Sequence, residues 1–273
     1  GYQARAGDRG ALSLPMARVL SALVLLPIVV GTIWFLSPLA TLLLAEVVLL
    51  FAFIEYAALC ARTGARFPQA PALVAAAVTC AAFGLVPTMA LAVLMTATVG
   101  LALVQLGQPD GTLAEMAASS CTILYLAVPL GALVAIRMSA GRETLLLLLV
   151  VIMMSDIAQY YGGRAFGRHP LAPAISPKKT VEGAVFGFAA GVLVLLLVGA
   201  WWLPGVHPVL RVVLGATLAG LGIAGDLFES KLKRTADVKD ASRLIPGHGG
   251  VLDRLDGILF AAPVYYAVVH LAR

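Results

Sequence analysis

Apolar segments of roughly 20 residues follow one another along almost the whole chain, and this pattern restricts the fold more than any other feature. Of the 273 residues, 61% are hydrophobic and 12% are charged, and the mean hydropathy is +0.97. Soluble domains carry about a quarter charged residues, so no water-soluble fold could cover this much apolar surface. Because about 20 apolar residues cross the hydrocarbon core as a helix, the sequence predicts an all-α, polytopic integral membrane protein.

Polar residues and Pro or Gly breaks divide the chain into about nine predicted transmembrane helices. The predicted spans are 17–36, 39–60, 72–87, 89–106, 117–136, 144–163, 182–203, 208–230 and 253–272. No polar block is long enough for a separate globule, so we expect one continuous membrane domain. Within it, residues 16–150 form N-terminal helices and 151–273 a C-terminal region that carries the polar motifs. Residues 1–15 are expected to be a flexible or vector-derived tail.

Lys and Arg in the loops indicate the orientation, because cytoplasmic loops retain positive charge during insertion. With a cytoplasmic N-terminus, all but four of the 19 basic residues are cytoplasmic; the exceptions are Arg137, Arg142, Arg211 and Arg273. Arg137 and Arg142 oppose this orientation and leave an even number of spans open. The two long polar loops, 164–181 and 231–252, are then cytoplasmic. We therefore expect a multi-pass protein of the cell (inner) membrane with its site on the cytoplasmic side.

The basic balance of the chain favours phosphate and anionic membrane lipid as partners. The net charge is +5 and the pI is near 9.3, but the basic residues are scattered between apolar spans without aromatic interleaving. Nucleic acid is therefore not an expected partner. Cys60, Cys80 and Cys121 lie singly in apolar surroundings, so they are interpreted as packing residues.

The segment 225–257 is the densest polar stretch, and it begins inside an apolar span. Asp226 continues a stripe of small residues at helical spacing, so it should point toward a neighbouring helix or a polar cleft. Asp253 and Asp256 share a face at the start of the next span. Carboxylates that meet at a membrane interface suggest Mg²⁺, with Asp226 and Asp253 as candidate ligands. For Lys231, Lys233 and Arg234, simple anchoring of a helix end by snorkelling is the alternative.

A Gly-rich turn that contains His248, Gly249 and Gly250 lies between these acids, beside Lys239 and Arg243. Glycines let backbone amides approach a ligand closely, and a helix N-terminus favours anions. The turn is therefore interpreted as a phosphate cradle, although such a turn alone is often only a turn.

A second polar segment runs from 155 to 183. Asp156 is a buried acid on the cytoplasmic half of its span. Ser176 is a suitable N-cap and Pro177 suits the first helical position, which would place Lys178 and Lys179 in the first turn of the next helix. Such a site would bind phosphate; a capped helix with positive-inside lysines is the competing interpretation.

Two glutamates in the second span, Glu46 and Glu55, are compatible with interhelical hydrogen bonds or with a cavity. The sequence does not distinguish between these two interpretations.

The run from Ser230 to Asp256, S-K-L-K-R-x4-K-D-x-S-x2-I-P-G-H-G-G-x2-D-R-x-D, resembles the signature of phosphatidate cytidylyltransferases. The upstream run from Gly163 to Gly183, which contains ISPKKT, is similar to the same family. The resemblance is specific over about 156–257, and residues 17–150 resemble the family mainly in hydropathy. One departure is Gln159, which stands between Ala158 and Tyr160 and affects the geometry expected around Asp156.

The resemblance implies a dimeric, all-helical membrane enzyme with Mg²⁺ at Asp226 and Asp253, accompanied by K⁺. The catalytic positions that it implies are Asp226, Lys233, Arg234, Lys239, Asp240, His248, Asp253, Arg254 and Asp256. The substrate-binding set consists of Ser176, Lys178 and Lys179 from the upstream loop, with Asp156, Gly249 and Gly250 from the residue patterns above.

The implied reaction transfers CMP from CTP to phosphatidic acid and yields CDP-diacylglycerol and pyrophosphate for phospholipid biosynthesis. A CTP-dependent polyprenol or phytol kinase, or a cytidylyltransferase for another lipid, would share the nucleotide site and differ in the acceptor groove. A transporter of anionic solutes predicts internal repeats with paired broken helices, and the sequence has no such symmetry. A CDP-alcohol phosphotransferase is disfavoured because the D-G-x2-A-R motif is absent.

Overall fold

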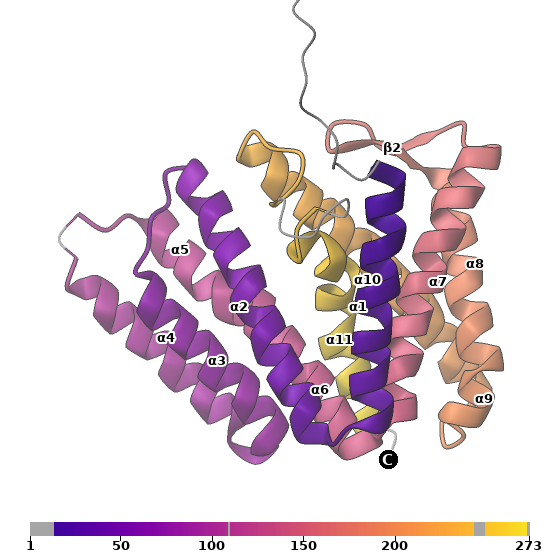
Figure 1. Cartoon of the computed structure of the whole chain (residues 1–273), viewed down its shortest axis with the longest axis horizontal. Helices are drawn as coiled ribbons and strands as arrows, with labels where there is room; N and C mark the ends of the chain where they lie inside the picture. The colour runs from indigo at the N-terminus through magenta and orange to yellow at the C-terminus, as the bar shows by residue number, and fades with distance from the viewer. Residues whose placement is uncertain (1–13, 109, 243–248, 272–273) are drawn as a thin grey trace, which may run out of the picture.

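The structure is a computed structural model that describes residues 14–108, 110–242 and 249–271. These residues form a bundle of helices with one short hairpin (Figure 1). The N-terminal helices are α1 (Leu14–Phe35), α2 (Pro38–Arg62), α3 (Gln69–Leu85), the 3₁₀ turn η1 (Pro87–Met89), α4 (Ala90–Leu106), α5 (Leu113–Cys121), the π segment η2 (Thr122–Ala127) and α6 (Val128–Ala140). The remaining elements are α7 (Arg142–Phe166), β1 (Pro170–Ala172), β2 (Ser176–Thr180), α8 (Val181–Leu197), α9 (Gly199–Trp202), α10 (Pro208–Thr235) and α11 (Leu252–Leu271).

A helix lies at each predicted span, with ends shifted by a few residues. Five helical segments within the described residues are long and apolar enough to cross a membrane: Pro38–Arg62, Pro87–Leu106, Leu113–Ala140, Arg142–Phe166 and Pro208–Thr235. Three shorter apolar helices accompany them, at Leu23–Phe35, Gln69–Leu85 and Val181–Leu197. The prediction of an all-α integral membrane protein is thereby confirmed at this coarser level.

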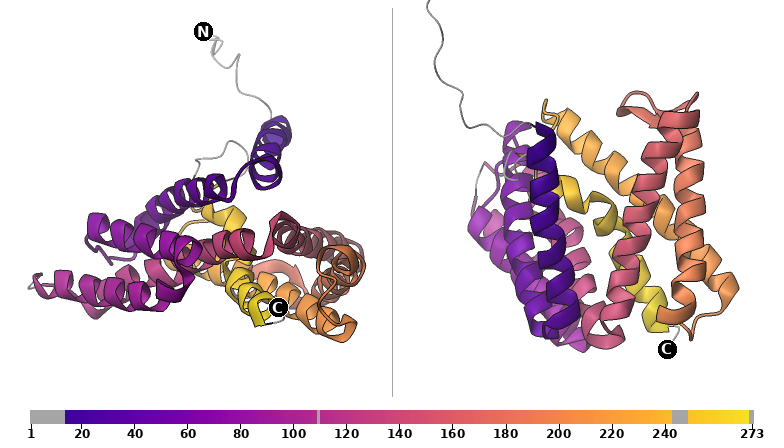
Figure 2. Two further views of the ribbon diagram at one scale, coloured as in Figure 1. Left: turned by 90° about the horizontal axis from the view of Figure 1, so that it is seen from below. Right: turned by 45° about the vertical axis from the view of Figure 1, so that its right-hand side comes forward.

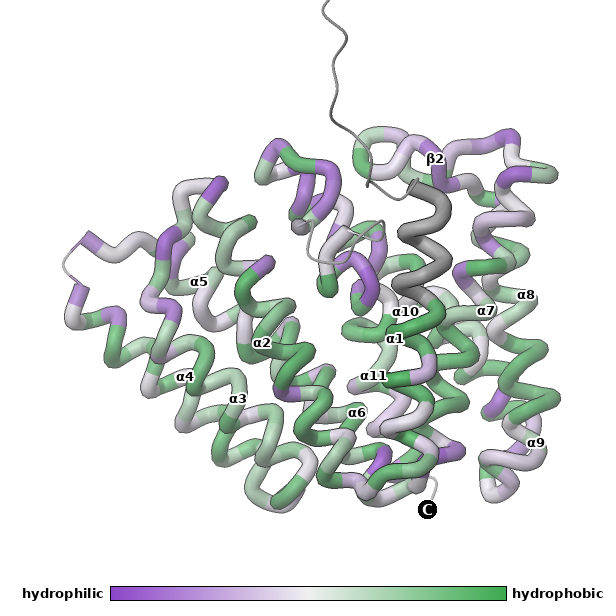
Figure 3. The backbone as a smooth tube through the Cα atoms, in the orientation of Figure 1, coloured by the Kyte–Doolittle hydropathy of each residue, from purple (hydrophilic) through white to green (hydrophobic). Residues whose placement is uncertain are grey.

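The helices form two groups joined through the middle of the bundle. The N-terminal helices α2 to α4 and the C-terminal helices α7 and α8 lie on opposite sides, with α11 between them (Figures 1 and 2). Helix α11 packs against both α6 and α10, and its Leu252 and Leu259 join the hydrophobic core of the N-terminal helices. Hydrophilic residues gather mostly at the end of the bundle that holds the hairpin and the last turns of α10, whereas the helix middles are hydrophobic (Figure 3).

Small residues allow the C-terminal helices to approach closely, as the stripe on α10 predicts. A Cβ atom on Gly215 would lie 2.9 Å from the Gly191 carbonyl oxygen of α8. A Cβ atom on Gly257 of α11 would lie 3.2 Å from the Gly222 Cα atom. Close backbone packing of this kind is typical of membrane helices, and it brings the first turn of α11 against α10.

The segment before α8 differs from the prediction. Ser176 does not cap a helix, because Ser176–Thr180 is a β-strand that pairs with β1. The helix begins at Val181, where the Thr180 hydroxyl caps it by accepting a hydrogen bond from the Gly183 amide. Lys178 and Lys179 therefore lie on a strand rather than in a first helical turn. Thr180 supplies the same N-cap chemistry as Ser176, and the sequence pattern favoured the wrong one of the two.

Candidate functional site

A cavity of about 490 Å³ opens at the polar end of the C-terminal helices, between α7, the hairpin, α8, α10 and α11. This volume lies within the usual range for ligand pockets. Its lining residues are Asp156, Gln159, Tyr160, Gly163, Arg164, Lys178, Lys179, Thr180, Gly183, Ala184, Asp226, Asp253, Arg254 and Asp256. Four carboxylates and four cationic side chains thus share one cavity, which suits a charged ligand. A smaller cavity of about 360 Å³ near α9 has a single carboxylate, Glu143.

Three helices each contribute an acid to this cavity. Asp156 comes from α7, Asp226 from α10 and Asp256 from α11. Both Asp226 and Asp156 lie near enough to Asp256 to repel its carboxylate. Such a grouping of acids is unfavourable without cations, so the site is built to be neutralised by lysine, arginine or a bound cation.

The hairpin supplies one such cation directly. The Lys179 ammonium lies 2.5 Å from Asp226 Oδ2, and Ser230 Oγ donates to Asp226 Oδ1 over 3.2 Å. Glu182 holds the base of the hairpin, because its Oε2 accepts from the Arg168 and His169 amides at 3.0 and 3.2 Å. The anchored hairpin therefore holds Lys179 over the acids.

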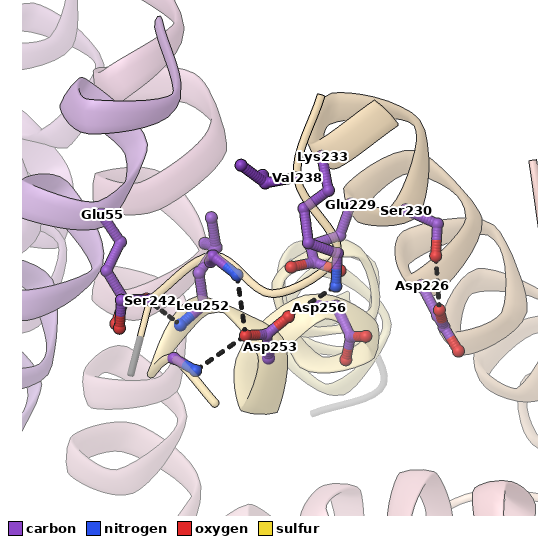
Figure 4. Close-up of polar contacts among 12 residues, drawn as sticks. Glu55, Asp226, Glu229, Ser230, Lys233, Val238, Ser242, Leu252, Asp253 and Asp256 are labelled. Carbon is purple, nitrogen blue, oxygen red and sulfur yellow. Dashed lines mark hydrogen bonds and ion pairs between the residues drawn. The ribbon is translucent and has the colours of Figure 1, made fainter. Parts of the chain in front are cut away.

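Lys233 lies in a second, more buried cluster (Figure 4). Its ammonium contacts Glu229 of the same helix and lies 2.5 Å from Asp253 Oδ1. The other Asp253 oxygen accepts hydrogen bonds from the Gly250 amide at 2.7 Å and the Ala241 amide at 3.1 Å. Only 8% of the Asp253 side chain and 1% of the Glu229 side chain are exposed. This cluster fastens the chain before α11 to the end of α10.

The structure brings to the cavity half of the predicted site residues that it describes. The predicted residues that line it are Asp156, Lys178, Lys179, Asp226, Asp253, Arg254 and Asp256. Those that do not line it are Ser176, Lys233, Arg234, Lys239, Asp240, Gly249 and Gly250. Arg234 is exposed in the last turn of α10, and Lys239 and Asp240 are exposed on the chain that follows it. His248 lies outside the described residues.

Several residues of the site were not predicted. Arg164 lines the cavity and donates to the Tyr160 hydroxyl at 3.4 Å. Its signal was present, since Asp156, Tyr160 and Arg164 stand at i, i+4 and i+8 on one helix face. Thr180 lines the cavity as well as capping α8. Glu229 also had a signal, because it stands four residues before Lys233 on the same helix face and pairs with it.

The carboxylates of the site can be compared with the coordination that a metal ion requires. Among residues 14–108, 110–242 and 249–271 no group of three His, Cys, Asp or Glu side chains is placed to hold a metal alone. Mg²⁺ commonly takes one or two carboxylates and fills its other positions with substrate phosphates and water. Both oxygens of Asp226 and both oxygens of Asp253 contact protein donors, but the Asp226 side chain is 34% exposed and that of Asp253 only 8%. Asp226 therefore suits a cation better than Asp253 does, with phosphate and water to complete the coordination.

Comparison with known proteins identifies a family and several relatives of this chain. The profile of the "Cytidylyltransferase family" matches residues 16–272. A phosphatidate cytidylyltransferase of Thermotoga maritima is 35% identical over 198 residues, which cover 68% of this chain and 72% of the relative. Proteins of the same name from Synechocystis and Brucella suis are 45% and 44% identical, over 44% and 46% of their own lengths. The chain belongs to the cytidylyltransferase family.

Proposed function

We propose that this chain is a phosphatidate cytidylyltransferase, which transfers CMP from CTP to phosphatidic acid in phospholipid biosynthesis. Family membership and the names of the relatives support CDP-diacylglycerol synthesis by a CTP-utilising nucleotidyltransferase. The cavity at the polar end of the bundle is the proposed site of this reaction, because four acids and four cations meet there. A triphosphate, a divalent cation and a lipid phosphate all require such mixed charge.

The reaction needs alignment and charge neutralisation more than a strong base. A phosphate oxygen of phosphatidic acid attacks the α-phosphorus of CTP, the bond to the β-phosphate oxygen breaks, and pyrophosphate leaves with that electron pair. The nucleophile is already anionic, so no side chain has to remove a proton from it. Positioned cations then lower the barrier by stabilising the charge on the transferring group.

The cationic side chains of the cavity are proposed to bind the phosphates. Lys178, Lys179, Arg164 and Arg254 line it from three separate elements. Lys179 now pairs with Asp226, and a phosphate would compete for the same ammonium. Lys233, buried between two carboxylates, is better suited to hold Asp253 in place. Roles for Ser176, Arg234, Lys239, Asp240 and His248 are proposed on the resemblance, and roles for Gly249 and Gly250 on the Gly-rich turn.

Mg²⁺ is proposed as the cofactor, held by Asp226 and Asp253 with Asp156 and Asp256 facing the same cavity. When bound, the ion would neutralise phosphate oxygens and act as a Lewis acid. Because Asp253 is already bonded to Lys233, Gly250 and Ala241, Asp226 is the more accessible of the two. We also propose the accompanying K⁺, without assigning residues to it.

The membrane arrangement is proposed to follow the sequence pattern. It comprises nine spans, a cytoplasmic N-terminus, a place in the inner membrane and a homodimer, with the division at residue 150. The hairpin and the end of α10 lie at the same end of the bundle (Figure 1), which supports a common side for the two polar loops. The site would then meet both cytoplasmic CTP and the lipid headgroup.

The test is incubation of the purified protein with cytidine-labelled CTP, phosphatidic acid and Mg²⁺. Lipid-extractable cytidine label is the expected result. Transfer of the γ-phosphate alone, followed with γ-labelled CTP, would contradict the proposal and indicate a lipid kinase.

A further inference from the structure

Glu55 lies in α2, away from the cavity lining, and yet it contacts the chain on both sides of residues 243–248 (Figure 4). It is 3% exposed. Its Oε1 accepts from Ser242 Oγ at 2.5 Å and from the Val251 amide at 2.9 Å, and its Oε2 accepts from the Leu252 amide at 2.7 Å. One carboxylate of the N-terminal helices is thus bonded to the start of α11, almost 200 residues later in the chain.

These bonds fix the first turn of α11. The first amides of a helix have no partner within the helix, and a carboxylate at this end is favoured by the helix dipole. Glu55 takes the amides of Val251 and Leu252, and Asp253 takes that of Gly250. Three consecutive amides are therefore held by two carboxylates from different helices.

The glycines before α11 make room for this arrangement. A Cβ atom on Gly250 would lie 2.5 Å from Glu55 Oε2, and one on Gly249 would lie 2.8 Å from Asp253 Oδ2. Gly249 also has φ = +81°, a conformation that favours glycine. In the described structure the Gly-Gly pair therefore lets protein carboxylates reach the backbone.

We infer that Glu55 is a positioning residue for the cavity. Asp253, Arg254 and Asp256 lie within the first turns of α11 and line the cavity, so the carboxylate that fixes this turn also fixes them. Glu55 acts through α11 and does not touch the ligand. The inference rests on the proposed function for its kinetic effect, but the structural part stands on the hydrogen bonds alone.

The test compares Glu55→Gln with Glu46→Gln in the full chain, purified in detergent. The glutamine keeps the volume of Glu55 but loses the charge and places an amide group against backbone donors. Glu46 is a matched control, because it lies in the same helix and its buried Oε1 has no hydrogen-bond partner within the described part of the chain. Hydrogen–deuterium exchange at residues 250–252 and CTP kinetics are measured for both variants.

Glu55→Gln is expected to speed amide exchange at residues 250–252 about tenfold and to lower kcat/KM for CTP about tenfold, the factor typical of a lost charge-assisted hydrogen bond. The KM for CTP should rise, whereas loss of folded protein alone would lower kcat and leave KM unchanged. Glu46→Gln should leave both measurements within about twofold of the wild type. Unchanged exchange, unchanged KM or equal effects of Glu46→Gln would overturn the inference.

Ser242→Ala provides a milder variant in case Glu55→Gln does not fold. It removes one of the three donors that Glu55 has among the described residues and should give a smaller change in the same direction, in exchange and in KM. No change in either would contradict the inference. The exchange measurement needs no turnover. If the wild type transfers no CMP, the proposed function fails, while exchange still decides whether Glu55 holds α11.

Discussion

Replacing Asp226 or Asp253 by Asn should abolish most cytidylyl transfer, but the two variants should differ in stability. Asp253 is 8% exposed and accepts from Lys233, Gly250 and Ala241. Removing its charge leaves a buried ammonium with Glu229 as its remaining contact among the described residues. Breaking a buried pair costs about 3–5 kcal/mol. Asp226 is 34% exposed, and loss of so accessible a pair costs about 1 kcal/mol or less.

The expected loss of stability is measured by thermal melting in detergent, and the expected loss of activity by transfer rates at saturating Mg²⁺. For a chain of this size, about 2–4 °C accompanies each kcal/mol, so Asp253→Asn should melt on the order of 10 °C lower and Asp226→Asn within a few degrees of the wild type. The double variant should transfer CMP little worse than either single variant, because residues that act on one ion are non-additive. Lys231, which is exposed, provides the control Lys231→Gln with a modest effect.

Either of two results would refute this reasoning. Near-wild-type transfer by Asp226→Asn would show that Asp226 does not hold the cation. Equal melting temperatures for Asp226→Asn and Asp253→Asn would show that the Lys233 cluster does not stabilise the end of α10. Equal losses of transfer for Lys231→Gln would show that the assay reports general damage.

Three further predictions follow from the cavity. Excess chelator should stop transfer and added Mg²⁺ should restore it; full turnover in chelator would exclude a required divalent ion. Lys179→Gln should lower kcat/KM for CTP about 10- to 100-fold, as expected for a lost charge-assisted contact to phosphate. A change below twofold would show that Lys179 does not bind the phosphates. Single cysteines placed at residues 170–175 and 237–240 should react with an impermeant thiol reagent only from the cytoplasmic side, and labelling from outside would reverse the orientation.

Much of the fold could be predicted because a bilayer imposes a simple rule on sequence. Apolar runs of helical length, bounded by polar or Pro and Gly residues, gave helices at every predicted position. The face of Asp226 was also predictable, since Gly215 and Gly222 mark the side of α10 that packs closely on its neighbours. Asp226 therefore lies on the helix face that its spacing predicted, and it lines a polar cavity.

Contacts between distant segments could not be predicted in the same way. Whether Ser176 or Thr180 caps α8 depends on the pairing of β2 with β1, which no local pattern specifies. The π segment Thr122–Ala127 was missed because its sequence is apolar and typical of an ordinary helix. The role of Glu55 was left open, since its partners stand almost 200 residues later.

The pairing of Lys179 with Asp226 helps to explain how so many charged side chains can share one cavity. An unpaired buried charge is costly, and the four acids and four cations of the cavity offset one another. A triphosphate that brings a divalent cation introduces both charge signs together. On the proposed function, Lys179 would bind a phosphate oxygen and Asp226 would hold the cation, so each group would exchange one opposite charge for another. The ion pair that balances charge in the cavity would therefore supply one side chain to the phosphates and the other to the cation.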